Sequence, residues 1–124
     1  MNIFGEEYGF LMTVGASTKI ADLCPDGDLT RMGEMMEGKT SEMMKFSIKL
    51  ILAMSEAYDA SERFWGREVT HKPLSEEMLN ALPLMELKKI QTEAVKAFKD
   101  GMATTVEVAP PKKEENPSKG QEST

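Results

Sequence analysis

The chain of 124 residues contains one cysteine and one histidine. A single cysteine excludes an intramolecular disulfide, and Cys24, at the end of an apolar helical stripe, is expected to be a small buried hydrophobe. His71 stands in a polar stretch before Lys72 and Pro73, so we expect a solvated side chain there. A zinc centre needs more residues of these kinds. The sequence predicts no metal, no cofactor and no catalytic site.

The sequence also lacks a long hydrophobic run and an excess of positive charge. No segment approaches the roughly 20 apolar residues that span a bilayer, and Glu6 and Glu7 stand where a signal peptide would carry lysines. The formal net charge of −6 and the isoelectric point near 4.9 disfavour nucleic acid and anionic membranes as partners. A cytoplasmic protein that binds other proteins is expected.

The acidic motifs do not assemble a site either. Glu6–Glu7, Glu76–Glu77 and Glu114–Glu115 are neighbours along the chain, and adjacent helical residues do not face each other. Asp26–Asp28 resembles part of a calcium loop, but the sixth position is Arg31 where an EF-hand requires glycine. There is no glycine-rich phosphate loop. These carboxylates are interpreted as helix caps and solvated surface.

The hydrophobic pattern predicts a mainly α-helical domain over residues 1–102, because the length suits one core and nothing in the middle resembles a linker. Asp28, Ser75 and either Thr40 or Ser41 are candidate N-caps. The longest expected helix is apolar on more than one face, so other elements should surround its middle. The predicted helices cover residues 14–24, 29–37, 41–65, 76–81 and 83–100. The third of them ends before Gly66, the fourth ends before Leu82, and the last stops at Gly101.

At the N-terminus Tyr8, Phe10 and Met12 alternate with other residues, which is typical of a half-buried strand. Residues 2–13 are expected to form a short hairpin that turns at Gly5, with Ile3 and Phe4 beside residues 8–10. An isolated hairpin is marginal in water, so its aromatic face should lie on helices or on another chain.

At the other end, residues 103–124 have almost no apolar content after Val108 and contain three prolines. Such a composition does not bury enough surface to offset the entropy of ordering. The segment is expected to be a disordered tail or linker.

Eleven methionines are many for this length, and six of them lie between residues 32 and 54. Two interpretations remain open, because methionine fills irregular gaps in a core and also suits a surface that accepts more than one shape. The candidate protein-binding residues are Met35, Met36, Met43 and Met44. Tyr8 and Phe10 form a second candidate surface, for self-association into a homo-oligomer.

The run from Ile3 to Phe10, continuing into Thr13-Val14-Gly15-Ala16, resembles the start of tail assembly chaperones from long-tailed bacteriophages and prophages. In that family a hairpin with a glycine-centred turn, an aromatic residue and a Gly-Ala step lead into a helical domain. Residues 20–29 are similar to members found in prophages of gut-type Firmicutes. The resemblance spans residues 1–102.

The resemblance implies a non-enzymatic, mostly helical protein of the host cytoplasm that is absent from the mature virion. Such a protein coats the tape measure protein and delivers tail tube subunits, the major tail protein. In many members a ribosomal frameshift makes a longer product with a second domain, and this chain would be the short form. Residues 103–124 would then be a spacer, and Pro111-Lys112-Lys113 is compatible with slippery codons.

Three alternatives remain. One is another small acidic helical adaptor, and a second is a secretion-type chaperone, although those proteins contain more strand. The third is a helix-turn-helix transcriptional regulator. Its candidate second helices, residues 29–37 and 76–81, carry one arginine between them and several acidic residues, which disfavours DNA binding.

Overall fold

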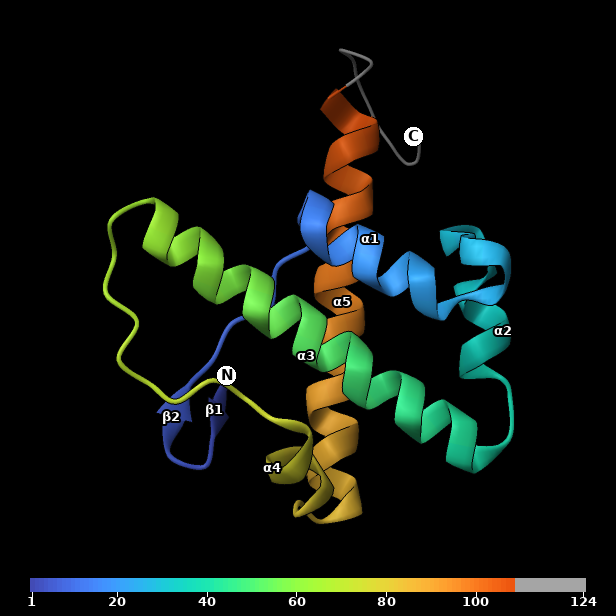
Figure 1. Ribbon diagram of the computed structural model, residues 1–124, viewed down its shortest axis with the longest axis horizontal. Helices are drawn as coiled ribbons and strands as arrows, with labels where there is room; N and C mark the ends of the chain where they lie inside the picture. Colours follow the sequence, from blue (N-terminus) through green and yellow to red (C-terminus); the bar gives the residue numbers. More distant parts are fainter. Residues whose placement is uncertain (109–124) are drawn as a thin grey trace.

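The computed structural model describes the backbone of residues 1–108 and the side chains of residues 1–102. The described chain forms a two-stranded hairpin followed by helices, which confirms the predicted mainly α-helical fold (Figure 1). The elements are β1 (Asn2–Ile3), β2 (Glu6–Glu7), α1 (Val14–Leu23), the 3-10 helices η1 (Pro25–Gly27) and η2 (Leu29–Arg31), α2 (Met32–Met36), α3 (Thr40–Phe64), α4 (Glu76–Asn80) and α5 (Leu84–Val108).

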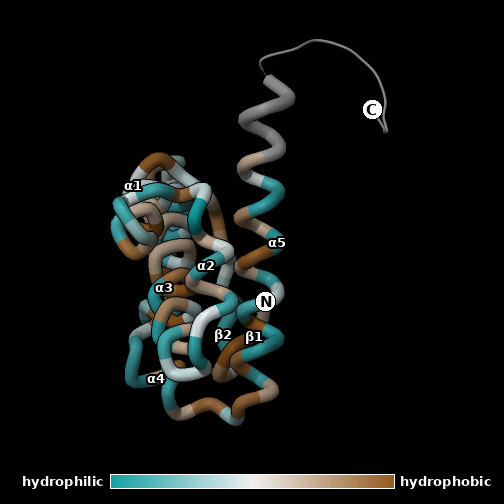
Figure 2. Tube along the Cα trace, turned by 90° about the vertical axis from the view of Figure 1, so that its right-hand side faces the viewer, coloured by the Kyte–Doolittle hydropathy of each residue, from teal (hydrophilic) through white to brown (hydrophobic). Residues whose placement is uncertain are grey.

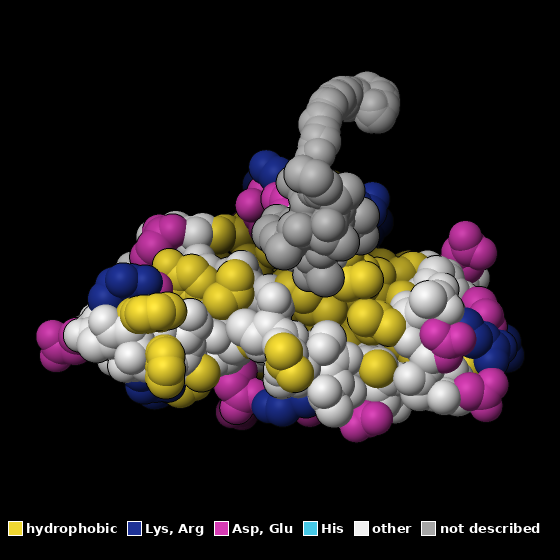
Figure 3. Space-filling model, turned by 90° about the horizontal axis from the view of Figure 1, so that it is seen from above, with side chains coloured by type: hydrophobic (Ala, Val, Ile, Leu, Met, Phe, Trp, Pro, Cys, Tyr) yellow, Lys and Arg dark blue, Asp and Glu magenta, His cyan; other side chains and the backbone are white. Residues whose placement is uncertain are grey.

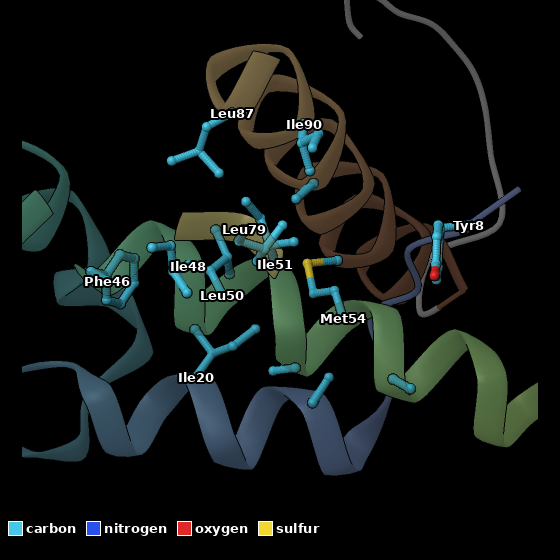
Figure 4. Packing of buried hydrophobic residues seen from close by; sticks show 14 of the residues in the cluster. Tyr8, Ile20, Phe46, Ile48, Leu50, Ile51, Met54, Leu79, Leu87 and Ile90 are labelled. Atoms are coloured by element: carbon cyan, nitrogen blue, oxygen red, sulfur yellow. The ribbon is translucent and has the colours of Figure 1, made fainter. Parts of the chain in front are cut away.

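Helix α3 lies at the centre of the fold, between two other helices. Helix α1 runs beside it in the opposite direction, and α5 crosses behind it as a separate layer (Figures 1 and 2). Figure 4 shows Ile20 of α1 on one side of α3, and Leu87 and Ile90 of α5 on the other side. Within α3, Leu50 and Ile51 are fully buried. The prediction that other elements surround the middle of this helix is confirmed.

Most helix ends follow local side-chain chemistry. The carboxylate of Asp28 accepts a hydrogen bond from the backbone N–H of Thr30, and the Ser75 hydroxyl accepts one from Met78, as predicted. Gly66, with φ +81°, follows the end of α3. The predicted side-chain cap on α3 is wrong, because the helix begins at Thr40 and the N-cap residue, Lys39, makes no capping hydrogen bond through its side chain.

The prediction that the last helix stops at Gly101 is also wrong, because α5 continues to Val108. Gly101 does not take the positive φ with which a glycine ends a helix. A Cβ at Gly101 would stand 2.5 Å from the Cβ of Met12, so glycine permits close packing at this point. Of the predicted tail, residues 109–124, including Pro111-Lys112-Lys113, lie outside the described residues.

The predicted N-terminal hairpin is present but shorter than expected. Asn2 pairs with Glu7 and Ile3 with Glu6, rather than residues 3–4 with residues 8–10. Phe4 and Gly5 form the turn with φ values of 54° and 81°. This sign of φ at both central residues is typical of the tight turns that match the twist of a hairpin.

Residues 8–13 are irregular, so the predicted strand over this alternating segment is wrong. The segment packs on helices, which have no free edge to pair with, and its main-chain contact to α3 is a 3.1 Å hydrogen bond from Leu11 N–H to the Met54 carbonyl. The alternation still describes the facing of the side chains. Tyr8 is buried, and Phe10 and Met12 pack half-buried against the core.

Candidate protein-binding surface

The four candidate methionines lie on α2 and the first two turns of α3, two helices that pack against each other. Met35, Met36 and Met44 are half-buried and pack against the hydrophobic core. Met43 is also half-buried. Their placement favours the first of the two interpretations, in which these side chains fill the corner between α2 and α3.

Tyr8 and Phe10, the other candidate pair, attach the N-terminal segment to the body of the protein. The Tyr8 side chain is 2% exposed, and its ring centroid lies 4.3 Å from that of His71. Its hydroxyl donates a 2.5 Å hydrogen bond to the Lys72 carbonyl. Burial, with smaller effects from the charges of Glu6 and Asp59, raises the pKa of Tyr8, so the hydroxyl keeps the proton that it donates. In this structure the Tyr8 side chain belongs to the interior.

The expectation of a solvated His71 is wrong. Its Nε2 atom lies 3.0 and 3.1 Å from the two carboxylate oxygens of Asp59, and Asp59 is 4% exposed. A buried carboxylate is costly without a hydrogen-bond donor, and His71 supplies one from the loop after α3. The sequence contains one signal for such a contact. Asp59 lies within the helix that is predicted to be surrounded by other elements, where a carboxylate needs a hydrogen-bond donor.

An open groove lies where the first half of α1 runs beside the second half of α3. We call it the α1–α3 groove; its volume is about 480 Å³. Its floor consists of small residues from both helices, namely Gly15, Ala16, Ala53, Ala57 and Ala60. Side chains this small leave room for large apolar side chains from outside to approach the two helix backbones.

Large apolar side chains stand at the end of this groove. Phe64, which lines the groove, is 80% exposed, and the adjacent Trp65 is 66% exposed. The two rings are in edge contact, with centroids 5.5 Å apart. On the α1 side Val14 is 84% exposed. Figure 3 shows hydrophobic side chains gathered over this end of α3, at the left of the view. Contiguous exposed apolar groups of this kind mark interaction surfaces.

The charged groups that line the groove neutralise each other. Lys19 of α1 and Glu56 of α3 both line it, and they form an ion pair that joins the two helices. Both side chains are well exposed, so the pair adds little to stability. The groove therefore offers a partner an apolar floor and an aromatic end. The two charges on its lining are paired with each other.

In the polar turn after α1, the carboxylates form hydrogen bonds with neighbouring residues of the chain. Arg31 bonds Asp26 at 2.6 Å and Glu34 at 2.7 Å. Hydrogen bonds from the hydroxyl and N–H of Thr30 lower the pKa of Asp28. No group of three or more His, Cys, Asp or Glu side chains among the described residues is placed to hold a metal ion. Every helix within the same residues is too short or too polar to span a bilayer.

Cys24 is buried as predicted, at 5% exposure. Its thiol donates to the Ile20 carbonyl, with 3.3 Å between sulfur and oxygen. Burial, and to a lesser degree the charge of Asp28, raises the pKa of the thiol. Since the thiolate is the reactive form, these surroundings make Cys24 a structural residue.

Comparison of the chain with models of protein families, with curated proteins and with solved structures finds no match.

The groove was not predicted from the sequence, although a signal for it exists. Ala53, Ala57 and Ala60 recur at helical spacing on one face of α3, and Phe64 and Trp65 follow them. Recognising that this face stays open requires knowing where α1 begins along α3, which is a tertiary property.

Proposed function

We propose that this chain is a non-enzymatic chaperone that binds an apolar helical segment of a client protein in the α1–α3 groove. We further propose that it is a tail assembly chaperone of a long-tailed phage or prophage, and that it acts in the cytoplasm of the bacterial host. Its clients would be the tape measure protein and the major tail protein.

The α1–α3 groove carries the binding part of this proposal. Its small-residue floor and exposed aromatic end resemble the apolar grooves into which amphipathic helices dock. A helix that follows α3 from Ala53 to Phe64 would be about 18 Å long, or roughly 12 residues, at 1.5 Å per residue.

The groove also constrains the side chains of the client. Because Gly15, Ala57 and their neighbours leave space, the contacting face of the client needs large apolar side chains, spaced three and four residues apart. Because Lys19 and Glu56 neutralise each other, the centre of that face carries no required charge. Many different helices meet these conditions, which suits a protein that coats a long client.

The resemblance of residues 3–29 to tail assembly chaperones supports the choice of clients. The tape measure proteins that this family binds are long and helical, so a single client molecule offers many segments of the required kind. The two lines of support overlap at Gly15 and Ala16, which belong to the run that carries the resemblance and also line the groove, whereas the lining from Ala53 to Phe64 lies outside that run.

The test is to co-express the tagged chain with the tape measure protein encoded near its gene. The complex is isolated through the tag and its mass is measured by size exclusion with light scattering. We expect many copies bound to each client, and a client that stays in solution only when the chain is present. If the client precipitates while the chain elutes alone, the proposal fails.

A matched pair of variants then locates the contact. Ala60→Lys places a charge in the groove, whereas Ala81→Lys makes the same change at an exposed alanine after α4. We expect Ala60→Lys to lose the client and Ala81→Lys to retain it. Equal retention by both variants would show that the client binds elsewhere.

A further inference from the structure

The connector from Arg67 to Ser75, which joins α3 to α4, is attached to the protein mainly at its ends. Arg67 N–H donates to the Glu62 carbonyl, and the Ser75 carbonyl accepts from Leu79 N–H. In the described part of the chain, residues 68–74 make no backbone–backbone hydrogen bond between these ends. Helix and sheet contacts therefore do not determine where the middle of the connector lies.

Side chains hold that middle part instead. His71 of the connector lies against Asp59 of α3 at 3.0 Å and against the Tyr8 ring at 4.3 Å. The next residue, Lys72, accepts the 2.5 Å hydrogen bond of the Tyr8 hydroxyl through its carbonyl. We call His71, Asp59 and Tyr8 the clasp. It joins three segments that are distant in sequence: the N-terminal segment, α3 and the connector.

Outside the clasp, most residues of the connector are exposed. Glu68, Thr70, Lys72 and Pro73 are exposed, while Val69 and Leu74 are half-buried. A cavity of about 230 Å³ is lined by Pro73 and Leu74 together with Leu52, Ser55 and Asp59 of α3, so that the apolar contact of the connector with the core is made by Leu74 beside this cavity. Few apolar contacts and few backbone hydrogen bonds are the features of segments that open locally at low free-energy cost.

We infer that the connector is a strap that opens as a unit while the α1–α3–α5 core stays folded, and that the clasp keeps it closed. Gly66, with φ +81°, and the N-cap Ser75 bound the strap as hinges. Opening uncovers Tyr8 and Asp59, which are 2% and 4% exposed when the strap is closed. The inference is independent of the proposed function, since it concerns the side of α3 away from the α1–α3 groove.

The contact between His71 and Asp59 contributes most to keeping the strap closed. When the strap is shut, Asp59 has His71 as its donor, and a buried carboxylate without a donor favours the open state, in which water replaces it. The charged and titratable groups around the pair are Glu6 and Tyr8 of the N-terminal segment, Glu56 and Arg63 of α3, and Lys72 of the strap.

Proteolysis of the native full-length chain tests the strap. Trypsin cuts after Arg67, and a glutamate-specific protease cuts after Glu68, both inside the strap. When opening is fast, the cleavage rate reports the open population. We compare His71→Phe, which keeps a ring beside Tyr8 but offers no donor, with His71→Gln, whose amide can still donate to Asp59. Thr70→Ala is the matched control at an exposed neighbour.

Cleavage at these two bonds is expected to be at least about tenfold faster in His71→Phe, and within about threefold of the unmodified chain in His71→Gln and Thr70→Ala. The faster cleavage should depend weakly on urea, because local opening exposes little surface. Equal rates, faster cleavage of His71→Gln than of His71→Phe, or a urea dependence equal to that of global unfolding would overturn the inference.

A second variant covers the case in which His71→Phe does not fold, as judged by circular dichroism. Tyr8→Phe removes only the hydroxyl that bonds the Lys72 carbonyl. We expect it to accelerate strap cleavage by about threefold to tenfold, in line with the loss of one hydrogen bond. A folded Tyr8→Phe variant with an unchanged cleavage rate would contradict a strap that is held by the clasp.

Discussion

The two halves of α3 have different surroundings although they belong to one uninterrupted helix. The half up to Met54 lies between α1 and α5, with Leu50, Ile51 and Met54 fully buried (Figure 4). The half from Ser55 to Phe64 has the clasp on one side and the open α1–α3 groove on the other. Phe64, at the end of this half, is exposed.

This difference separates two tasks that hydrophobic residues perform. In the first half, apolar side chains on more than one face bring three helices together, so their burial stabilises the fold. In the second half, small residues line a surface that the chain leaves open. Truncating a large residue should therefore cost folding free energy in the first half and partner affinity in the second.

The largest expected effect tests the first half. Ile51→Ala removes a side chain with 0% exposure and leaves a cavity between helices. We expect the free energy of unfolding to fall by about 3 kcal/mol. Urea denaturation measures it, with an unchanged dependence on urea concentration as evidence that the fold is retained. A loss below about 1 kcal/mol would mean that this half is not the core.

The next largest effect is expected where the N-terminal segment packs against the second half of α3. In Gly9→Ala, the added Cβ would lie 2.5 Å from the ring of Tyr58, so the segment or the ring must move. We expect destabilisation by about 2 kcal/mol. Gly33→Ala is the control, because its methyl group meets open space and alanine favours the helix, which should add about 0.5 to 1 kcal/mol. Equal effects of both substitutions would rule out close packing at Gly9.

A smaller effect of opposite sign belongs to the first half. The hydroxyl of Ser47 is fully buried and has no hydrogen-bond partner among the described residues. Ser47→Ala removes an unsatisfied polar group with little change in shape, so we expect stability to rise by about 1 kcal/mol. Thermal unfolding is a sufficient measurement. A clear loss of stability would indicate that the hydroxyl has a partner in solution.

The smallest effect on stability is expected at the open end of α3. Phe64→Ala changes a side chain that is 80% exposed, so the free energy of unfolding should change by about 0.5 kcal/mol or less. Client affinity should fall by about tenfold or more if the aromatic end is an anchor. A variant that is strongly destabilised would show that Phe64 supports the fold, and the contrast between the halves would be lost.

Local patterns predicted most helices and two of their caps, Asp28 and Ser75, because periodicity and capping depend on residues close in sequence. Gly101 was misinterpreted because a glycine that ends a helix and one that allows close packing look the same in sequence. Likewise, the alternation of Tyr8, Phe10 and Met12 predicted which side chains face inward but not that helices would be their neighbours.

Neither the α1–α3 groove nor the clasp was predicted from the sequence. The contact between His71 and Asp59 joins a loop to a helix, and neither residue type indicates the other along the chain. The α1–α3 groove depends on α1 starting beside the second half of α3, which leaves Phe64 exposed. Both depend on how helices are placed in three dimensions, which hydrophobic periodicity does not specify.

The measurement that tests the central claim most directly uses Trp65, the only tryptophan in the chain. Its side chain is 66% exposed next to the groove, so its emission reports on occupation of that site. Purified tape measure protein segments without tryptophan would be titrated into the chain while its fluorescence is recorded. We predict a saturable blue shift that Ala60→Lys abolishes and Ala81→Lys preserves. A client that binds, as judged by light scattering, without changing the emission of Trp65 would contradict the account.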